Sequence, residues 1–369
     1  PPLRTGEADL TAIEQVAHMI GENLNGAKII FIKSTIPMGC GKKVRNLIEQ
    51  TNRGKYPFEV AFSPEFLREG TSVRDFFYPD RVVLGSDSVM AQQTFCEILK
   101  PLIQQSVPFV FTSIESAEII KYASNSFLAV KISFANEIAN LCEAVGADIV
   151  EVMTGMGLDT RIGPYFLKPG PGYGGSCLPK DTLAFLHDAK KNDLDLKIVA
   201  AAIDVNRKQP SRILHKLTYL LDGSLQGKTV AIFGLAFKEN TDDVRESPAS
   251  KIIDQLLRHG AHIQAFDPLA TDNMRKIHPN IDYYHSFEEA AQDADLALFL
   301  SCWKPISDKD LSNLRAAMKS PIVLDARNCI DPSLLDQYQF KYDNVGRAHF
   351  TDRFIEEQCN NQNLLEIIP

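Results

Sequence analysis

The chain has 369 residues, too many for one ordinary hydrophobic core, so two or three domains are expected. Hydrophobic residues make up 44% and charged residues 23%, as in an ordinary soluble globular protein. The formal net charge of -8 argues against general binding to nucleic acid or anionic membranes, and no apolar run approaches the roughly 20 residues of a membrane span.

The first 113 residues alternate between helical and strand-like segments. A helical pattern at about 8–24 precedes "AKIIFIKST", a nearly continuous apolar run of the kind that a strand buried on both faces shows. A second helix follows "IPMGC", and then come strand-like "FEVAFS" and "DRVVLGS", a helix near 88–104 and strand-like "PFVFTSI". This order predicts a doubly wound α/β unit with mostly parallel strands, whose first strand and Gly-rich turn are absent from the sequence.

The pattern changes between residues 115 and 146, where apolar residues recur at spacings of three and four without a proline. One long helix is predicted, of a length typical of a connector or a subunit interface. Helical segments continue to about Asp222, interrupted by a Gly/Pro-rich stretch at 163–175.

The α/β alternation then resumes, with the strands "KTVAIFG", "AHIQAFDP", "ADLALFL" and "SPIVLDAR" and the capped helix "SPASKIIDQLLRHG". The predicted fold class is therefore α/β, with two Rossmann-like doubly wound domains joined by a central all-helical domain. The expected boundaries are 1–113, 114–215 and 216–369.

Seven cysteines are scattered widely and include no C-x-x-C, so neither a zinc site nor a disulfide framework is indicated. The segment "PPLRTGEADL" has no charged or apolar region of the kind found in signal peptides. We therefore expect a protein of the reducing cytoplasm with no bound metal.

The stretch "GPGYGGSCLPKD" at 170–181 formally satisfies G-x-G-x-x-G, the fingerprint of dinucleotide binding. That fingerprint requires a buried strand before it, and the preceding "RIGPYFLKP" is interrupted by Gly163, Pro164 and Pro169. We therefore reject the match and expect a loop whose backbone can approach a ligand closely.

The same loop presents Cys177 to a helix. Pro179 suits the first turn of the helix-like "TLAFLHDAKK", so Cys177 would lie close to the helix N-terminus, where the dipole and Lys180 favour a thiolate. Asp181 follows four residues later on the same face. A nucleophilic Cys beside a carboxylate that positions water suits thioester chemistry. In the alternative, Cys177 is a buried small hydrophobic residue and the glycines only turn the chain.

At these residues the sequence resembles the UDP-glucose/GDP-mannose dehydrogenase family, whose catalytic-cysteine signature looks like "GPGYGGSCLPKD". Further motifs fall in the family's order and spacing: "KSTIP" (33–37), "SPEFLREGT" (63–71), "KYASN" (121–125), "RIGPYFLKPG" (161–170), "FGLAFKENTDDVRES" (233–247) and "DAR" (325–327). Seven motifs in register extend the resemblance over the whole length present.

The resemblance implies an NAD-dependent oxidation of UDP-glucose at C6, from alcohol to carboxylate, with two NAD⁺ per sugar and UDP-glucuronate as product. Oxidation of GDP-mannose or a UDP-N-acetylhexosamine is the alternative within the family, although "GPGYGGSC" looks more like the UDP-glucose enzymes. A second alternative is a nucleotide-sugar-binding fragment without catalysis. The first strand, the Gly-rich turn and the ribose-binding acid of the family are absent, which would impair NAD⁺ affinity if the molecule began at Pro1.

The resemblance also implies the catalytic roles. Cys177 would capture the aldehyde as a thiohemiacetal and then form a thioester. Lys121 would assist proton transfers and stabilise oxyanion charge, with Asn125 one turn further along the same helix face. Asp181 would orient the hydrolytic water and Glu65 would act as general acid/base. Alternatively, Lys121 is a solvated helix lysine and Glu65 favours a helix start beside Pro64.

Binding residues are likewise implied by the resemblance. For NAD⁺ they are Ser34, Thr35, Ile36, Glu69, Cys177, Lys180 and Arg245. For the UDP-sugar they are Glu65, Phe66, Leu67, Arg68, Glu69, Lys121, Asn125, Arg161, Phe166, Lys168, Gly172, Tyr173, Gly174, Phe237, Lys238 and Arg327. Arg161 would come from a partner subunit of a homodimer built on the long helix. A surface ion pair is the alternative for Arg161 and Arg327.

Overall fold

The structure is a computed structural model that describes residues 8–347. The chain divides into two compact units. The first unit contains Pro1–Phe127 and Lys180–Lys197, and the second contains Leu128–Pro179 and Ile198–Pro369.

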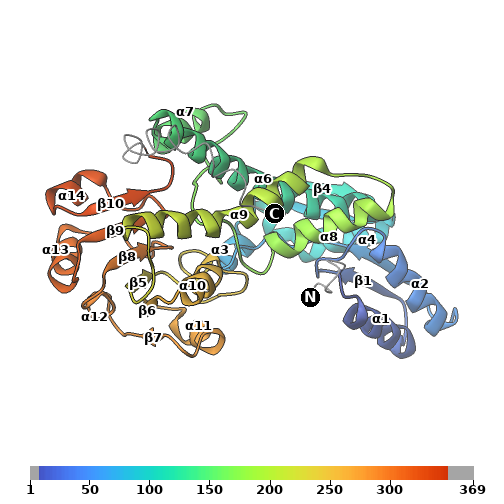
Figure 1. The fold of residues 1–369 in the computed structure, drawn as a ribbon. Helices are drawn as coiled ribbons and strands as arrows, with labels where there is room; N and C mark the ends of the chain where they lie inside the picture. Colours follow the sequence, from blue (N-terminus) through green and yellow to red (C-terminus); the bar gives the residue numbers. More distant parts are fainter. Residues whose placement is uncertain (1–7, 348–369) are drawn as a thin grey trace. The chain divides into compact units, whose positions relative to one another are not determined.

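The first unit is built on a four-stranded sheet with the order β1-β2-β3-β4. Its two edge strands, β1 and β4, are labelled in Figure 1. Its strands are β1 (Lys28–Ile32), β2 (Phe58–Phe62), β3 (Val82–Gly85) and β4 (Phe109–Thr112). β1 and β2 are parallel, as are β3 and β4, but β2 pairs with β3 in the antiparallel sense at Phe62 and Gly85. The connection between β2 and β3 contains only the short helix α3 (Ser72–Phe77), without the long crossover helix usual between parallel strands.

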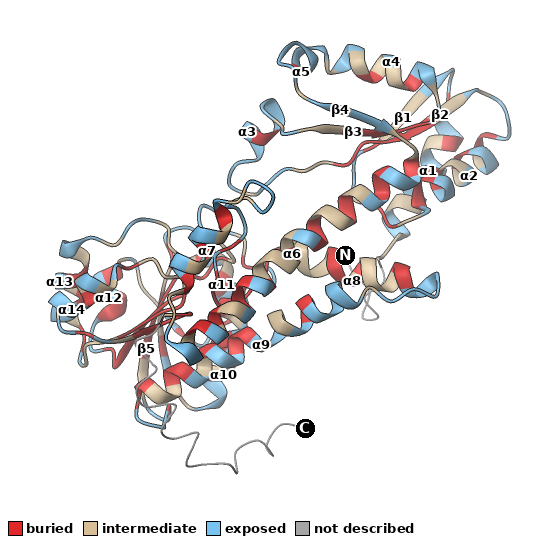
Figure 2. Ribbon diagram, turned by 90° about the horizontal axis from the view of Figure 1, so that it is seen from above, coloured by how far each residue is buried: buried red, intermediate tan, exposed pale blue. Residues whose placement is uncertain are grey.

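Helices cover both faces of this sheet. α1 (Thr11–Asn23) and α2 (Cys40–Asn52) lie on one face, and α4 (Val89–Ile98) lies on the other (Figure 2). The helix predicted near 88–104 is two helices: the chain leaves helical geometry at Leu99, and Pro101, which has no N–H to continue the hydrogen bonds of α4, lies in the first turn of the separate α5 (Lys100–Gln104).

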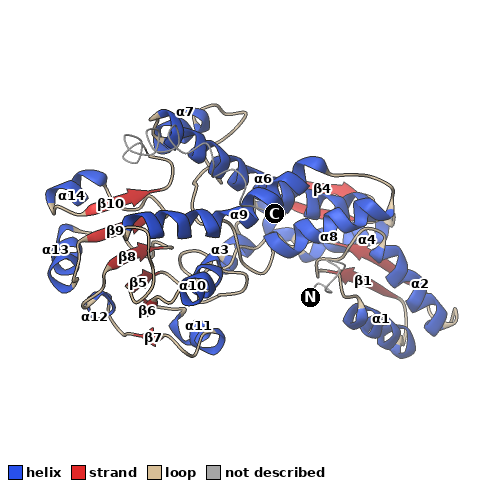
Figure 3. Ribbon diagram, viewed as in Figure 1, coloured by secondary structure: helices blue, strands red, loops and turns tan. Residues whose placement is uncertain are grey.

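The second unit contains a six-stranded sheet, drawn in red in Figure 3, with the order β10-β9-β8-β5-β6-β7. All of its neighbouring strands are parallel. The strands are β5 (Thr229–Phe233), β6 (His262–Phe266), β7 (Asp282–Tyr283), β8 (Leu296–Phe299), β9 (Ile322–Asp325) and β10 (Lys341–Asn344). This order is that of a doubly wound dinucleotide-type fold, so the predicted α/β class is confirmed.

Alternation along β5 explains how both faces of this sheet are buried. Val230 and Ile232 pack into one core cluster, and Ala231 and Phe233 into the other. The surrounding helices are α7 (Ile149–Gly157), α10 (Pro248–Arg258), α11 (Thr271–Ile277), α12 (Phe287–Ala291), α13 (Asp308–Ala317) and α14 (Pro332–Gln337).

Three long helices contain residues of both units. They are α6 (Ile114–Val145), α8 (Leu178–Lys191) and α9 (Lys197–Leu220). The prediction of one uninterrupted helix at 115–146 is confirmed. Pro179 lies in the first turn of α8, also as predicted.

Cys302 and Cys329 form a disulfide. The cysteine spacing did not indicate any disulfide, and this expectation is wrong for these two residues. They lie 27 positions apart in no recognisable motif, and the parallel topology brings the ends of β8 and β9 together. Cys359 lies outside the described residues. None of the helices that the structure describes combines the length and the apolar character needed to cross a membrane.

Candidate active site

Lys121 on α6 forms a partly buried ion pair with Glu65 from the loop after β2. The Lys121 Nζ donates to the Glu65 carbonyl oxygen at 2.6 Å and to Glu65 Oε1 at 3.2 Å. The Lys121 side chain is only 4% exposed, so the alternative of a solvated lysine is wrong. Glu65 lies in a loop rather than at a helix start, so the alternative for Glu65 is also wrong. The pair holds an ammonium and a carboxylate together at a fixed place.

One turn further along α6, Asn125 holds Asp181. The Asn125 Nδ2 donates to Asp181 Oδ2 at 2.6 Å, and the neighbouring Lys180 ammonium pairs with Asp181 Oδ1. Asp181 lies in the first turn of α8 and is 1% exposed. A buried carboxylate with two donors has a fixed orientation and keeps lone pairs with which to accept a further hydrogen bond.

Two further cations lie near this loop, Lys33 close to Glu65 and Arg81 over the Phe66 ring, and the sequence interpretation did not assign a role to either. The Arg81 guanidinium lies 3.6 Å from the centre of the Phe66 ring, and Lys121 lies over the same ring at 5.2 Å. Burial lowers the pKa of Lys33, an effect that Glu65 opposes and Lys121 reinforces. Burial also lowers the pKa of Arg81. Lys121 and Lys33 therefore place two positive charges near the Glu65 carboxylate, an arrangement that favours a nearby developing negative charge.

Leu67 and Arg68, which follow in the same loop, form hydrogen bonds to residues close by in the chain. The Leu67 N–H donates to Glu65 Oε2 at 2.6 Å. Arg68 forms a two-pronged pair with Asp75, at 3.0 Å from Nε and 2.6 Å from Nη2. These Arg68 hydrogen bonds hold the pKa of Asp75 well below its usual range. Arg68 thus stabilises the loop before α3, and Glu69 beside it is half-buried.

A cavity of about 320 Å³ lies at the carboxyl end of β1 in the first unit. Ser34, Thr35 and Ile36 line it, together with Tyr122 and Lys180. The lining combines a hydroxyl-rich strand end with aliphatic and aromatic surface. This position is where open α/β sheets bind ligands, because the strand ends leave a crevice there.

In the second unit, the glycine-rich loop packs closely against the connection between β5 and α10. The Gly175 N–H donates to the Arg245 carbonyl oxygen at 2.9 Å. Gly175 has a φ of +84°, and a Cβ added there would lie 2.7 Å from the Phe237 ring. A Cβ at Gly174 would lie 2.2 Å from the Glu246 carbonyl oxygen. The glycines therefore allow a close approach, here to the protein's own backbone.

We expect Gly174→Ala to destabilise the protein by about 2 kcal/mol or more, because the added methyl collides with backbone that cannot move away freely. Gly155→Ala is the matched control, since a Cβ at this α7 position meets nothing within 4 Å. The control should be neutral or stabilising by up to about 1 kcal/mol. Urea denaturation of both variants measures the difference, and equal stability would contradict the packing described.

Two asparagines that the sequence interpretation missed hold this loop. Asn136 Oδ1 accepts the Gly170 N–H at 2.8 Å. Asn206 accepts the Tyr173 N–H at 2.7 Å and donates to the Tyr173 carbonyl oxygen at 3.0 Å. Asn136 follows Asn125 by about three turns of α6 and is fully buried. The sequence offered a signal for Asn136, because its spacing from Asn125 places both asparagines on one face of α6.

Cys177 is accessible and directly precedes α8. Its Sγ lies 3.5 Å from the Ser176 Oγ. Of the free cysteines in the described part of the chain, Cys40 and Cys142 are buried, Cys96 is intermediate and Cys177 is exposed. The alternative of a buried hydrophobic Cys177 is therefore wrong. The thiol can meet a substrate without unfolding the loop.

Arg327 follows β9 and contacts backbone carbonyls rather than a carboxylate. Its Nε donates to the Leu300 oxygen at 2.7 Å and its Nη2 to the Phe237 oxygen at 3.4 Å. Burial lowers the pKa of Arg327. Within residues 8–347 no carboxylate forms an ion pair with it, so the surface-pair alternative is wrong here. Beside it, Lys238 Nζ lies 5.6 Å from the Phe237 ring centre.

Arg161 and Arg245 each form an ion pair with a nearby aspartate on the surface. Arg161 pairs with Asp159 at 2.5 Å and is 87% exposed. Arg245 pairs with Asp243 at 2.8 Å and is 66% exposed. For Arg161 the surface ion pair is thus what this single chain shows. The remaining loop residues are distributed as follows: Phe166 and Lys168 are exposed, and Gly172 and Tyr173 are buried.

Comparison with known families accounts for most of the chain. Profiles of the UDP-glucose/GDP-mannose dehydrogenase family match residues 1–103 (NAD binding domain), 115–208 (central domain) and 231–332 (UDP binding domain). The chain is 43% identical over 348 residues to the UDP-glucose 6-dehydrogenase TuaD of Bacillus subtilis (strain 168), covering 94% of this chain and 75% of that protein. The chain belongs to the UDP-glucose/GDP-mannose dehydrogenase family. It is an NAD-dependent dehydrogenase.

Further relatives extend this family assignment. The UDP-glucose 6-dehydrogenase of Rickettsia felis (strain ATCC VR-1525 / URRWXCal2) is 42% identical over 349 residues, which cover 94% of this dehydrogenase and 77% of the relative. A UDP-glucose dehydrogenase structure from Pyrobaculum islandicum superposes with a TM-score of 0.84 at 33% identity, covering 94% and 78% of the two chains. A UDP-D-ManNAc dehydrogenase structure from Pyrococcus horikoshii gives a TM-score of 0.82 at 25% identity, covering 94% and 79%.

The cavity at the end of β1 fits part of the NAD that this dehydrogenase uses. Its volume of about 320 Å³ suits one end of a dinucleotide rather than the whole cofactor. Thr35 and Ser34 offer hydroxyls and backbone amides, and Ile36 and Tyr122 offer apolar surface. These residues would hold the cofactor here, where it supplies the hydride acceptor.

Proposed function

We propose that this dehydrogenase oxidises UDP-glucose at C6 to UDP-glucuronate, using two NAD⁺ and one water per sugar. The observation that carries the proposal is the exposed Cys177 at the start of α8, with the held carboxylate of Asp181 in the first turn of the same helix. Relatives from Bacillus subtilis and Rickettsia felis, named as UDP-glucose 6-dehydrogenases, support the substrate.

In this proposal Cys177 makes the second oxidation possible. Removal of a first hydride converts the C6 alcohol to an aldehyde, and the Cys177 thiolate adds to it to form a thiohemiacetal. Loss of a second hydride gives a thioester. Water then adds to the thioester carbonyl and the thiolate leaves, which gives the carboxylate and restores the enzyme.

The first-unit residues provide charge and proton transfer. The Lys121 ammonium stabilises the oxygen of C6 when it becomes negative, in the way that an oxyanion hole does. Glu65, held by Lys121, accepts and returns protons during thioester breakdown. Asp181, fixed by Asn125, orients the hydrolytic water. Each role depends on a side chain whose position is fixed by a hydrogen bond.

Residues of the second unit bind the nucleotide end of the substrate. Arg327 offers a half-buried guanidinium with unused donors, and guanidinium groups match phosphate oxygens well. Lys168 and Lys238 add positive charge, and the Phe237 ring and the loop of Gly172, Tyr173 and Gly174 offer planar and backbone contacts. Phe166 completes this set.

A substrate comparison tests the specificity. We expect kcat/KM for UDP-glucose to exceed that for GDP-mannose and for UDP-N-acetylmannosamine by about a hundredfold or more, because buried polar groups reject a misfitted ligand strongly. The second of these competitors is relevant because a structural relative from Pyrococcus horikoshii carries the name UDP-D-ManNAc dehydrogenase. Preference for either competitor would keep the family and overturn UDP-glucose as substrate.

We further propose that residues 1–113, 114–215 and 216–369 serve as cofactor-binding, dimerising and UDP-sugar-binding domains. The dimer would form through α6, which exposes Phe127, Phe134 and Leu141 at intervals of seven residues. Arg161 would then act on the partner's substrate. Cytoplasmic reductants would keep Cys177 as a free thiol.

The dimer proposal predicts that Phe134→Glu separates the subunits, because a charge would be buried in the interface. Sedimentation velocity measures the mass. Ala316→Glu is the control, since it introduces the same charge at an exposed position of another helix, α13. A fully active monomer would contradict the proposal.

A further inference from the structure

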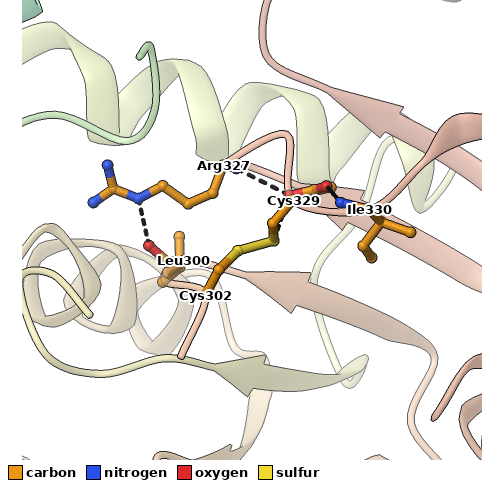
Figure 4. The surroundings of a disulfide bond; sticks show 6 residues. Leu300, Cys302, Arg327, Cys329 and Ile330 are labelled. Atoms are coloured by element: carbon orange, nitrogen blue, oxygen red, sulfur yellow. Dashed lines mark hydrogen bonds between the residues drawn. A yellow bond between two sulfur atoms is a disulfide. The ribbon is translucent and has the colours of Figure 1, made fainter. Parts of the chain in front are cut away.

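The Cys302–Cys329 disulfide joins the segments that follow two adjacent strands, β8 and β9 (Figure 4). Cys302 lies three residues beyond the end of β8, and Cys329 lies four residues beyond the end of β9. Because the strands are parallel, both segments leave the sheet at the same edge. This edge carries Arg327, the cation proposed to bind the nucleotide diphosphate.

The bridge lies directly beside the hydrogen bond that positions Arg327. Arg327 precedes Cys329 by two residues, and the Leu300 carbonyl that accepts its Nε precedes Cys302 by two residues. The 2.7 Å hydrogen bond and the disulfide therefore close one ring between the two segments (Figure 4). A change in the distance between the two segments therefore affects both the disulfide and the hydrogen bond between Arg327 and Leu300.

The turn that carries Arg327 is fixed at its base by a buried carboxylate. Asp325 is 1% exposed and accepts the Arg327 N–H at 3.0 Å and the Ile330 N–H at 2.7 Å. Asn328 in this turn has a φ of 53°, in the left-handed region that asparagine tolerates. The backbone of Arg327 is thus determined by its own strand, but the direction of its side chain depends on the neighbouring segments.

The Arg327 side chain has no ion pair within the described residues that would hold it independently. Its hydrogen-bond acceptors are the neutral carbonyl oxygens of Leu300 and Phe237, the second at 3.4 Å. Neutral hydrogen bonds are weaker than charge-paired ones, so the orientation of the guanidinium depends on how firmly those carbonyls are held. The disulfide supplies this constraint on the Leu300 side.

We propose that the Cys302–Cys329 disulfide is a redox-sensitive positioning element that sets Arg327 for a nucleoside diphosphate. The proposal rests on the proposed function of this site. Reduction by a dithiol breaks the S–S bond and forms two S–H groups, while the dithiol loses two electrons and two protons and becomes a cyclic disulfide. Both cysteines are partly accessible, so a small dithiol can reach them. Disulfides in reducing compartments are usually of this responsive kind.

The test measures binding of UDP to the full chain carrying Cys177→Ser, so that the catalytic thiol does not react. Isothermal titration calorimetry is performed in reduced and in oxidised dithiothreitol, and thiol labelling with mass spectrometry reports the state of the two cysteines. We expect the oxidised form to bind UDP about three to ten times more tightly, the factor that corresponds to ordering one long side chain.

Two variants serve as controls in the same background. Cys302→Ser with Cys329→Ser should bind UDP as weakly as the reduced form and should not respond to the redox buffer. Cys96→Ser removes a partly accessible free cysteine of the first unit and should respond like the parent. With Cys177 restored, the double variant should raise the KM for UDP-glucose by the same factor and change kcat less than about twofold.

Three results would overturn the inference. They are equal UDP affinity in the two redox states, a double variant that binds as tightly as the oxidised parent, and absence of the disulfide in the oxidising buffer. These results leave the proposed function intact. If UDP fails to bind in either state, the assignment of the nucleotide site fails, and this inference fails with it.

Discussion

Replacing Cys177 by serine is expected to lower kcat for formation of UDP-glucuronate by at least about a thousandfold. A serine hydroxyl is a far weaker nucleophile than a thiolate at neutral pH, so the aldehyde is not captured and the second oxidation has no thiohemiacetal to act on. The measurement is NADH formation together with chromatographic detection of UDP-glucuronate. UDP should still bind, because the proposed nucleotide contacts are made by other residues.

Cys96→Ser is the matched control, since Cys96 is a partly accessible free thiol on α4. It should retain activity within about twofold. A Cys177→Ser enzyme that still produced the acid at more than a tenth of the parental rate would contradict the nucleophile assignment. Loss of activity in both variants would indicate an effect of general thiol loss rather than of this residue.

Replacing Lys121 by methionine is expected to lower kcat by about a hundredfold to ten-thousandfold. Methionine retains much of the side chain's length but removes the charge that holds Glu65 and stabilises oxygen at C6. Because Glu65 is about one-third exposed, water can solvate its released carboxylate, and the fold should persist. Steady-state kinetics and circular dichroism on one preparation measure the two effects separately.

Lys131→Met is the matched control, because Lys131 lies on the same helix and its Nζ donates to a neutral acceptor, the Ile162 carbonyl oxygen, at 3.0 Å. We expect a change of less than about threefold in kcat. If Lys121→Met retained parental kcat, Lys121 would be a structural residue and not a participant in charge stabilisation.

The sequence predicts the fold well where hydrophobic periodicity is strong. β1, β5 and α6 follow from a buried apolar run or from an uninterrupted three-and-four spacing. Short elements such as α3 and β7 were missed, because they contain too few residues to show a period. The antiparallel contact between β2 and β3 was also missed, since strand direction depends on the connection and not on the strand's own residues.

The residues of the candidate site also fall into two groups: those that local motifs in the sequence indicate, and those that only the tertiary fold brings to the site. Cys177 and Lys121 belong to local motifs, so their positions just before α8 and on α6 follow from the sequence, while their catalytic roles stay predictions. Arg81 and Asn206 were not found, because they reach Phe66 and Tyr173 through the tertiary fold. The partner of Cys302 could not be found for the same reason.

The roles proposed for two arginines depend on molecules other than this chain. Arg161 and Arg245 occupy exposed local ion pairs here, and their proposed roles depend on a partner subunit or on the bound cofactor.

The number of NADH molecules formed per UDP-glucose consumed tests the central claim most directly. Limiting UDP-glucose with excess NAD⁺ is allowed to react to completion, and absorbance at the NADH band is compared with the sugar nucleotide consumed. The proposed thioester route predicts two NADH per UDP-glucose and a carboxylate product. One NADH per UDP-glucose, with the aldehyde as product, would contradict it.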